Sequence, residues 1–230
     1  TYAHHLMFSR DESDLNQLSF GISGVLIESQ LDETKFRNSG NYDPIVDGTI
    51  VQKESYVNFD IGASYSYLEF FSHLTVKNAV ETRRNIYTAY ESDNLRKLIF
   101  SAGYTFGDSD IVLWEPSIMF QSVEKTKESS IDFNLKAYKN FEDGKIWGGL
   151  SYRRSLDGAQ YIKTNGIAEQ KLQYLTPILG VNYKNFMFAY TYSQLFGDVK
   201  FDNAGFHQIT IGLNLFCEPE RYHCNCPANN

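Results

Sequence analysis

The alternation of apolar and polar residues constrains the fold of this chain more than any other feature of its sequence. Successive side chains of a β-strand point to opposite faces, so a strand with one apolar face shows a hydrophobic period of two. In residues 57–66 the side chains expected on the apolar face are Val57, Phe59, Ile61, Ala63 and Tyr65. Eleven segments carry this pattern: 1–8, 16–27, 57–66, 70–78, 98–106, 111–122, 131–138, 146–153, 175–183, 186–194 and 207–215. In the sixth segment, Pro116 predicts a bulge or a local break in pairing, because proline cannot donate a hydrogen bond to the ladder.

The connections between these segments alternate in length along the chain. The short connections are 9–14, 66–69, 107–110, 140–144 and 184–185, and the longer ones are 29–55, 79–97, 123–129, 154–170 and 195–205. Most segments have about the 9–11 residues that cross a bilayer as a tilted strand. An up-and-down outer-membrane barrel has short turns on the periplasmic side and long loops outside the cell. The sequence therefore predicts an all-β protein, a transmembrane antiparallel β-barrel whose apolar face contacts membrane lipid and whose long loops 29–55, 79–97 and 154–170 lie outside.

The parity of the strands predicts that this chain is the later part of a longer barrel. It opens with TYAHHLMF, which already has the pattern of a strand and not that of a signal peptide. With the long loops outside, eleven strands require an odd number of earlier ones, which makes an even-stranded barrel as in bacterial outer-membrane proteins. We expect residues 1–216 to form the barrel portion and residues 217–230 to form a periplasmic tail.

Composition agrees with a strand-rich membrane protein and excludes other classes. Aromatic residues make up 15% of the chain, with 16 Tyr and 17 Phe, which suits pleated strands and membrane interfaces. No apolar run approaches the roughly 20 residues of a transmembrane helix. The formal net charge of −7 and the dispersed Lys and Arg residues argue against nucleic acid as a partner.

Several stretches, in this order and at this spacing, resemble the PorP/SprF family of type IX secretion system membrane proteins. They are NQLSFGIS (16–23), FDIGASYSY (59–67), LIFSAGYTFG (98–107), EPSIMF (115–120), IWGGLSYR (146–153) and YTYSQLFGDVKFDNAGFHQITIGLNLF (190–216). The ending YHCNCPANN looks most like the SprF-type branch. The resemblance covers nearly the whole chain, as the C-terminal two-thirds or so of a family member.

The resemblance implies a non-enzymatic barrel in the bacterial outer membrane that helps export or anchor a cell-surface protein such as an adhesin. It also implies other type IX secretion components as partners and a link to gliding motility. The alternation of residues by itself implies only a barrel. A general diffusion porin or small-solute transporter is therefore the alternative function, and an outer-membrane enzyme is a third.

Charged residues fall on the polar face of the expected strands. The candidates for a barrel lumen are Asp60, Glu115, Asp132, Lys136 and Arg153. They could line a pore or hold a plug or a partner segment. The simpler interpretation is a set of paired charges that fills the lumen, because buried charges are tolerated only when paired and hydrogen-bonded.

The histidines do not assemble a catalytic set. His73 is expected on the lumen face, but no G-x-S-x-G nucleophile elbow accompanies it. His4, His5 and His207 lie near the ends of strands, where an interfacial role is expected. We therefore expect no catalytic residue and no cofactor.

All three cysteines, Cys217, Cys224 and Cys226, lie in the tail. One disulfide plus a spare thiol is the leading interpretation, because the periplasm favours disulfides. The spacing fits a zinc site poorly, although His223 could supply a nitrogen ligand, and we expect no metal. A rigid periplasmic tag that docks on another secretion component is the functional alternative.

Overall fold

The computed structural model describes residues 1–8, 16–32, 51–81, 95–108, 111–163, 166–196 and 205–213. The strands in these ranges are β1 (Tyr2–Met7), β2 (Asn16–Asp32), β3 (Val51–Tyr67), β4 (Phe70–Lys77), β5 (Lys97–Tyr104), β6 (Phe106–Asp108), β7 (Val112–Val123), β8 (Ser129–Phe141), β9 (Gly144–Ser155), β10 (Ala159–Lys163), β11 (Gly166–Gln170), β12 (Gln173–Tyr183), β13 (Phe186–Phe196) and β14 (Phe206–Leu213). Nowhere in this described part of the chain is there a helix long and apolar enough to cross a membrane.

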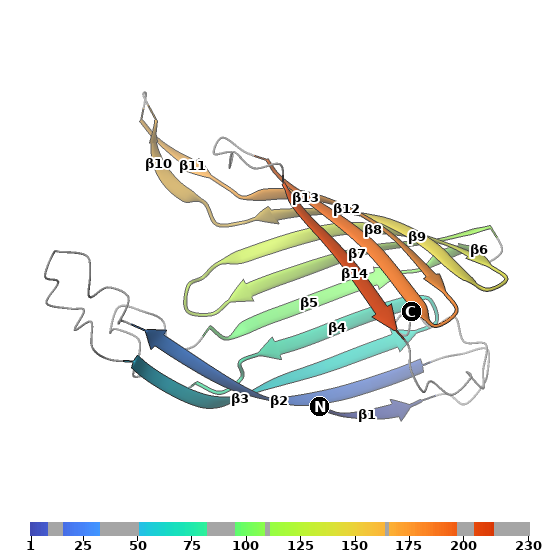
Figure 1. The fold of residues 1–230 in the computed structure, drawn as a ribbon, viewed down its shortest axis with the longest axis horizontal. Helices are drawn as coiled ribbons and strands as arrows, with labels where there is room; N and C mark the ends of the chain where they lie inside the picture. The colour runs from blue at the N-terminus through green and yellow to red at the C-terminus, as the bar shows by residue number, and fades with distance from the viewer. Residues whose placement is uncertain are drawn as a thin grey trace, which may run out of the picture.

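One antiparallel sheet organises the molecule. Its strands follow the order β1-β2-β3-β4-β5-β7-β8-β9-β12-β13-β14, with the short β6 paired to β7. The hairpin β10–β11 stands apart from it, and β1 and β14 are the two edges of the strongly curved sheet (Figure 1). No pairing joins these edges within the described residues. The expected all-β antiparallel fold with eleven main strands is therefore confirmed, as an open sheet consistent with part of a barrel.

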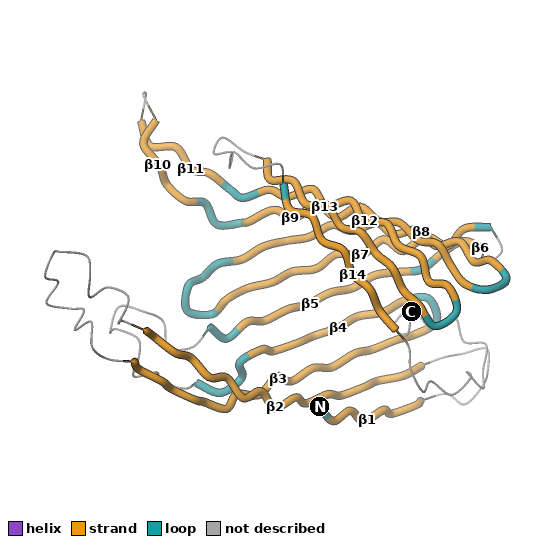
Figure 2. Tube along the Cα trace, in the orientation of Figure 1, coloured by secondary structure: helices purple, strands orange, loops and turns teal. Residues whose placement is uncertain are grey.

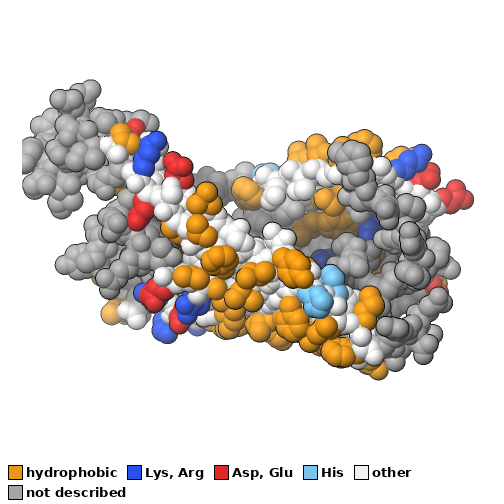
Figure 3. Space-filling view, turned by 90° about the horizontal axis from the view of Figure 1, so that it is seen from below, with side chains coloured by type: hydrophobic (Ala, Val, Ile, Leu, Met, Phe, Trp, Pro, Cys, Tyr) orange, Lys and Arg blue, Asp and Glu red, His pale blue; other side chains and the backbone are white. Residues whose placement is uncertain are grey.

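The two faces of the sheet have the opposite polarity to those of a soluble protein. In β3 the side chain of Val57 is 52% exposed, whereas its polar neighbour Asn58 is only 2% exposed. The same contrast recurs across the sheet, from Leu26 in β2 to Ile209 in β14, both of which are exposed. Seen from the side of β1 to β3, apolar side chains cover the middle and charged ones gather toward the ends (Figure 3). Exposed apolar residues in a band of this kind are typical of a surface that contacts lipid.

The strands β2 and β3 are longer than the sequence predicts. They pair without interruption from Asn16 opposite Tyr67 to Asp32 opposite Val51. The segment 29–55, expected as a loop, therefore begins and ends as strand. Because β4 pairs with β3 only over residues 61–67, the outer half of this hairpin extends past β4. Figure 2 shows the two strands running beyond the neighbouring ones.

The prolines of the sheet interrupt pairing on one side only. Gly103 of β5 pairs with Ser117 of β7, and β6 resumes pairing with β7 in the same register, so there is no bulge opposite Pro116. On its other side Pro116 pairs with β8 in sequence. The expected bulge is therefore wrong and the expected local break in pairing is confirmed. Pro177 interrupts the pairing of β12 with β13 in the same way. The cause is the missing N–H of proline, which removes one ladder donor.

The connections at the two ends of the sheet differ, although not as regularly as expected. Two-residue turns join β3 to β4, β8 to β9 and β12 to β13. At the opposite end, residues 156–172 contain the separate hairpin β10–β11. The connection 124–128 is shorter than the connection 8–15 at the other end, so the alternation of lengths fails for this pair. Most of the expected connections 9–14, 29–55, 79–97 and 195–205 lies outside the described residues, as does the tail.

Candidate functional site

The five charged residues chosen from the sequence lie on the face opposite the exposed apolar side chains, and four of them form two ion pairs. Asp132 is 3% exposed, and its carboxylate accepts hydrogen bonds of 2.7 Å from both Nε and Nη2 of Arg153. Glu115 is 5% exposed and accepts bonds of 3.1 Å from Nζ of Lys136 and from the hydroxyl of Tyr138. Each pair joins neighbouring strands, because the partners lie opposite one another in the register.

These charges form separate groups and not one network. Asp132 and Lys136 are four residues apart on β8, which is about 13 Å along a strand. Asp60 has a third environment, since its Oδ1 accepts a hydrogen bond of 3.0 Å from the backbone N–H of Asn78. Asp60 therefore meets the end of β4, where the chain leaves the sheet.

His73 has a partner that sequence reasoning missed. Its Nδ1 lies 2.8 Å from Oγ of Ser64, its cross-strand neighbour on β3. The ring also lies 5.4 Å from that of Phe71. The pair resembles half of a catalytic triad, but the nearby carboxylate of Glu115 is bonded to Lys136 and the hydroxyl of Tyr138. His5 makes the same contact with the serine opposite it, so a cross-strand bond explains both. The only sign of the contact between His73 and Ser64 in the sequence is that both residues fall at positions of the polar face.

The buried Asn58 of β3 holds the start of the connection from β4 to β5. Its side-chain N–H donates to the carbonyl of Val80 at 3.1 Å, and its Oδ1 accepts from the N–H of Val80 at 3.1 Å. The side chain of Asn78 reaches across to the carbonyl of Leu95, at the other end of the same connection, at 3.2 Å. Both stems of this long connection are thus fixed by side-chain amides.

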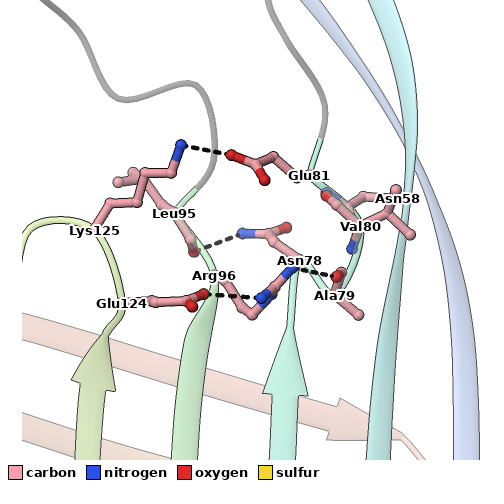
Figure 4. Close-up of polar contacts among 9 residues, drawn as sticks. All are labelled: Asn58, Asn78, Ala79, Val80, Glu81, Leu95, Arg96, Glu124 and Lys125. Atoms are coloured by element: carbon pink, nitrogen blue, oxygen red, sulfur yellow. Dashed lines mark hydrogen bonds and ion pairs between the residues drawn. The ribbon is translucent and has the colours of Figure 1, made fainter.

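Two ion pairs tie these stems to the connection between β7 and β8 (Figure 4). Arg96 donates from Nη1 to Glu124 at 2.9 Å and from Nη2 to the carbonyl of Ala79 at 2.9 Å. Lys125 donates to Glu81 at 2.6 Å. Arg96 therefore bridges three segments that are far apart in the sequence. Each pair is exposed enough that its own contribution to stability is small.

The row of contacts continues toward β12. The backbone N–H and the hydroxyl of Ser129 both donate to the carboxylate of Asp157. The N–H of Leu156 donates to the carbonyl of Ser129 at 2.9 Å, and the N–H of Ser155 donates to that of Leu172 at 2.8 Å. We call the whole set, residues 78–81, 95–96, 124–129, 155–157 and 172, the stem rim. It fixes the backbone where the chain leaves the sheet.

The hairpin β10–β11 projects beyond the stem rim (Figure 1). Ile162 and Ile167 pair across it and are 90% and 76% exposed. Two large aliphatic side chains at such a position lie outside the apolar band of the sheet. They are suited to contact with another protein, because an exposed apolar cluster is typical of interaction surfaces.

The described residues contain no group of three or more His, Cys, Asp or Glu side chains that could hold a metal ion. Cys217, Cys224 and Cys226 lie outside the described residues. The contacts observed at the stem rim are hydrogen bonds and ion pairs.

Comparison with known proteins adds a family to this geometry. The family model described as type IX secretion system membrane protein PorP/SprF matches residues 1–213. A comparison with curated proteins found no match, and neither did one with solved structures.

Proposed function

The chain belongs to the PorP/SprF family of type IX secretion system membrane proteins, as its motifs suggested, and from this premise we propose that it is a non-enzymatic outer-membrane barrel that helps export or anchor a cell-surface protein such as an adhesin. The stem rim and the projecting hairpin form the contact region for that protein. Membrane lipid and other type IX secretion components are the remaining partners.

The difference between the two ends of the sheet carries this proposal. One end has three two-residue turns, between β3 and β4, β8 and β9, and β12 and β13, which leave little surface for a partner. The other has long connections with stems fixed by side-chain contacts, and a hairpin with Ile162 and Ile167 exposed. Fixed stems and aliphatic anchors with a charged surround suit a protein interface.

The apolar face supports an outer-membrane location. Side chains such as Leu26, Ile61 and Ile209 are exposed at alternate positions of their strands, while the other face is polar. A closed barrel in lipid requires this arrangement, because the lipid-facing positions must be apolar and the lumen can be polar. Barrels of this kind occur in bacterial outer membranes.

A hairpin variant tests the proposed contact. Replacing Ile162 and Ile167 together by Ser should lower the recovery of exported surface proteins in a pull-down from solubilised outer membranes, and it should lower their display on intact cells. A matched control places Ser at Glu142 and Asp143, in a two-residue turn at the opposite end. Equal recovery with both variants, at equal barrel levels, would remove the hairpin from the proposal.

Epitope tags test the orientation. Tags within 29–55, 79–97 and 154–170 should be stained by antibody on intact cells. Staining only after permeabilisation would place the stem rim on the periplasmic side and overturn the proposed role.

The tail, residues 217–230, is proposed to be a periplasmic unit distinct from the barrel portion, residues 1–216. A bridge between Cys217 and Cys224 or Cys226 would close only a short loop, which adds little global stability. Deleting the residues after Phe216 should leave the heat resistance of the barrel nearly intact and lower the recovery of secretion components. A collapsed barrel would assign the tail a structural role instead.

A porin is distinguished by conductance. The full-length protein in planar bilayers should stay silent if the lumen is occupied or narrow, as expected for an anchor. Steady ion conductance of the protein, together with normal export of surface proteins in cells that lack it, would favour the porin alternative.

A further inference from the structure

A hollow of about 750 Å³ lies just inside the stem rim, on the polar face of the sheet. Its volume falls within the roughly 300–1,000 Å³ of small-ligand sites. Its lining comes from β5, β7, β8, β9, β11 and β12 and from the connections near them, and it includes Lys97, Gln121, Glu128, Arg153 and Asp157.

The register of the sheet brings this lining together. Lys97 lies opposite Val123, Ser130 opposite Ser155, and Arg153 opposite Tyr174. Lys97 and Arg153 stand on strands three positions apart, which is about 15 Å across the sheet. The register places Arg153 level with Ser101, four residues or about 13 Å along β5 from Lys97, so the two backbones are about 20 Å apart. Two long cationic side chains at this separation can both contact an extended ligand that lies between them.

Both cations keep hydrogen-bond donors for a ligand. Within the described residues the side chain of Lys97 has no hydrogen bond or ion pair. Arg153 uses Nε and Nη2 on Asp132, but a guanidinium carries five N–H groups, so donors remain on Nη1 and Nη2. Its side chain is 43% exposed, so these donors are accessible.

The lining also contains two carboxylates, those of Glu128 and Asp157. Each oxygen of the Asp132 carboxylate, behind the hollow, accepts a bond from Arg153, and the carboxylate of Asp157 is bonded by Ser129. Glu128 is exposed to solvent. Gln121, which has no side-chain partner in the described part of the chain, offers an amide that matches a peptide group. The hollow thus presents charged donors and an amide, which suits a carboxylate on a peptide.

We propose that this hollow binds an extended acidic peptide segment whose carboxylates are held by Lys97 and Arg153. The assignment of that segment to the exported protein rests on the function proposed above. The binding chemistry does not depend on it.

The test measures peptide binding to the full-length protein in lipid nanodiscs by calorimetry. The probe is an acetylated and amidated hexapeptide of alternating Glu and Gly, compared with the same peptide carrying Gln for Glu and with free succinate. The acidic peptide should bind at least about tenfold more tightly than its Gln form, since a charge-assisted hydrogen bond is worth that much. Its affinity should fall as salt is raised.

Lys97→Gln should weaken binding of the acidic peptide by about tenfold. It leaves no buried charge behind, so the fold is retained. The matched control is Lys139→Gln, an exposed lysine near the two-residue turn of β8, which should bind normally. Arg153→Lys, which keeps the charge beside Asp132 and loses the fork, should also weaken binding.

Three results overturn the proposal: equal binding of the Gln peptide, no effect of Lys97→Gln, or succinate binding as tightly as the peptide, which would assign the site to a small solute. Failure here is distinguishable from failure of the proposed function. If the peptide does not bind but the hairpin variant still loses the surface protein, only the hollow is misassigned. If the peptide binds but the hairpin variant retains the surface protein, the hollow stands and the proposed contact region fails.

Discussion

Ion pairs occur both on the polar face of the sheet, which we call the inner face, and at the stem rim, but their exposure to solvent differs. Asp132 is almost fully buried and receives two parallel bonds from Arg153. Glu124 is 57% exposed, and its partner Arg96 is 36% exposed. Removing Arg153 therefore leaves the buried charge of Asp132 without a partner, whereas water can replace Arg96 beside the exposed Glu124.

The buried ion pairs thus stabilise the sheet, whereas the exposed ion pairs of the stem rim position the connections. The inner pairs join neighbouring strands at fixed register, so they act on the whole sheet. The rim contacts join segments that leave the sheet, so they act locally on the stems. Variants of the inner pairs should therefore lower the free energy of unfolding of the whole sheet, and variants of the stem rim should have smaller, local effects.

The largest effect is expected from Arg153→Met, which should lower the free energy of unfolding by about 3–5 kcal/mol because Asp132 is left buried and unpaired. The measurement is urea titration of the full-length protein in bilayers. Adding Asp132→Leu to the same chain should recover most of the loss. If Arg153→Met lowered the free energy of unfolding no more than Arg96→Ala, the pair of Asp132 and Arg153 would not be shielded from water.

Ile61→Arg should cost about 2–4 kcal/mol in the same titration, since it places a charge on the apolar face at the middle of the sheet. Its control is Gly62→Ser on the opposite face. A Cβ there would meet its nearest atoms at 3.7 Å, which is ordinary contact, so this change should be mild. Equal tolerance at both positions would reverse the assignment of the faces.

Asn58→Ala should cost about 1–3 kcal/mol, because it removes both bonds to the backbone of Val80. Its effect should be local to the stem, with faster trypsin cleavage at Arg83 or Arg84. Asn182→Ala, which removes a bond to the indole of Trp147 near the opposite end, is the comparison and should leave that cleavage unchanged. Equal acceleration by both variants would mean that Asn58 acts through global stability.

Arg96→Ala should have the smallest effect, below about 1 kcal/mol, because the ion pair is exposed. The loss should shrink further as salt is raised. Recovery of the surface protein in the pull-down should nevertheless fall, since Arg96 joins three segments of the stem rim. A large, salt-independent loss of stability would place Arg96 with the inner pairs and end the distinction between the two regions.

The sequence by itself determined the all-β class, the approximate positions of the eleven main strands and the polarity of their faces, although β2 and β3 extend beyond the predicted segments. Period-two alternation is a local property of the chain, so it can be read without knowing which strands pair. The same rule places Asp132, Lys136 and Arg153 on the polar face. The break in pairing at Pro116 is also a local property, because proline has no N–H to donate to the ladder. The family motifs are likewise local.

The tertiary structure alone decided which of these residues meet. Asp132 faces Arg153, and Ser64 faces His73, because turn lengths set the register of each hairpin. The bonds from Asn58 to Val80 and the hollow beside Lys97 need several strands at once, so no pattern in one segment predicts them. Alternation depends only on neighbouring residues in the sequence. Contacts between strands depend on the register of every strand pair in the sheet, and a shift of one residue in a strand would move its side chains to the opposite face.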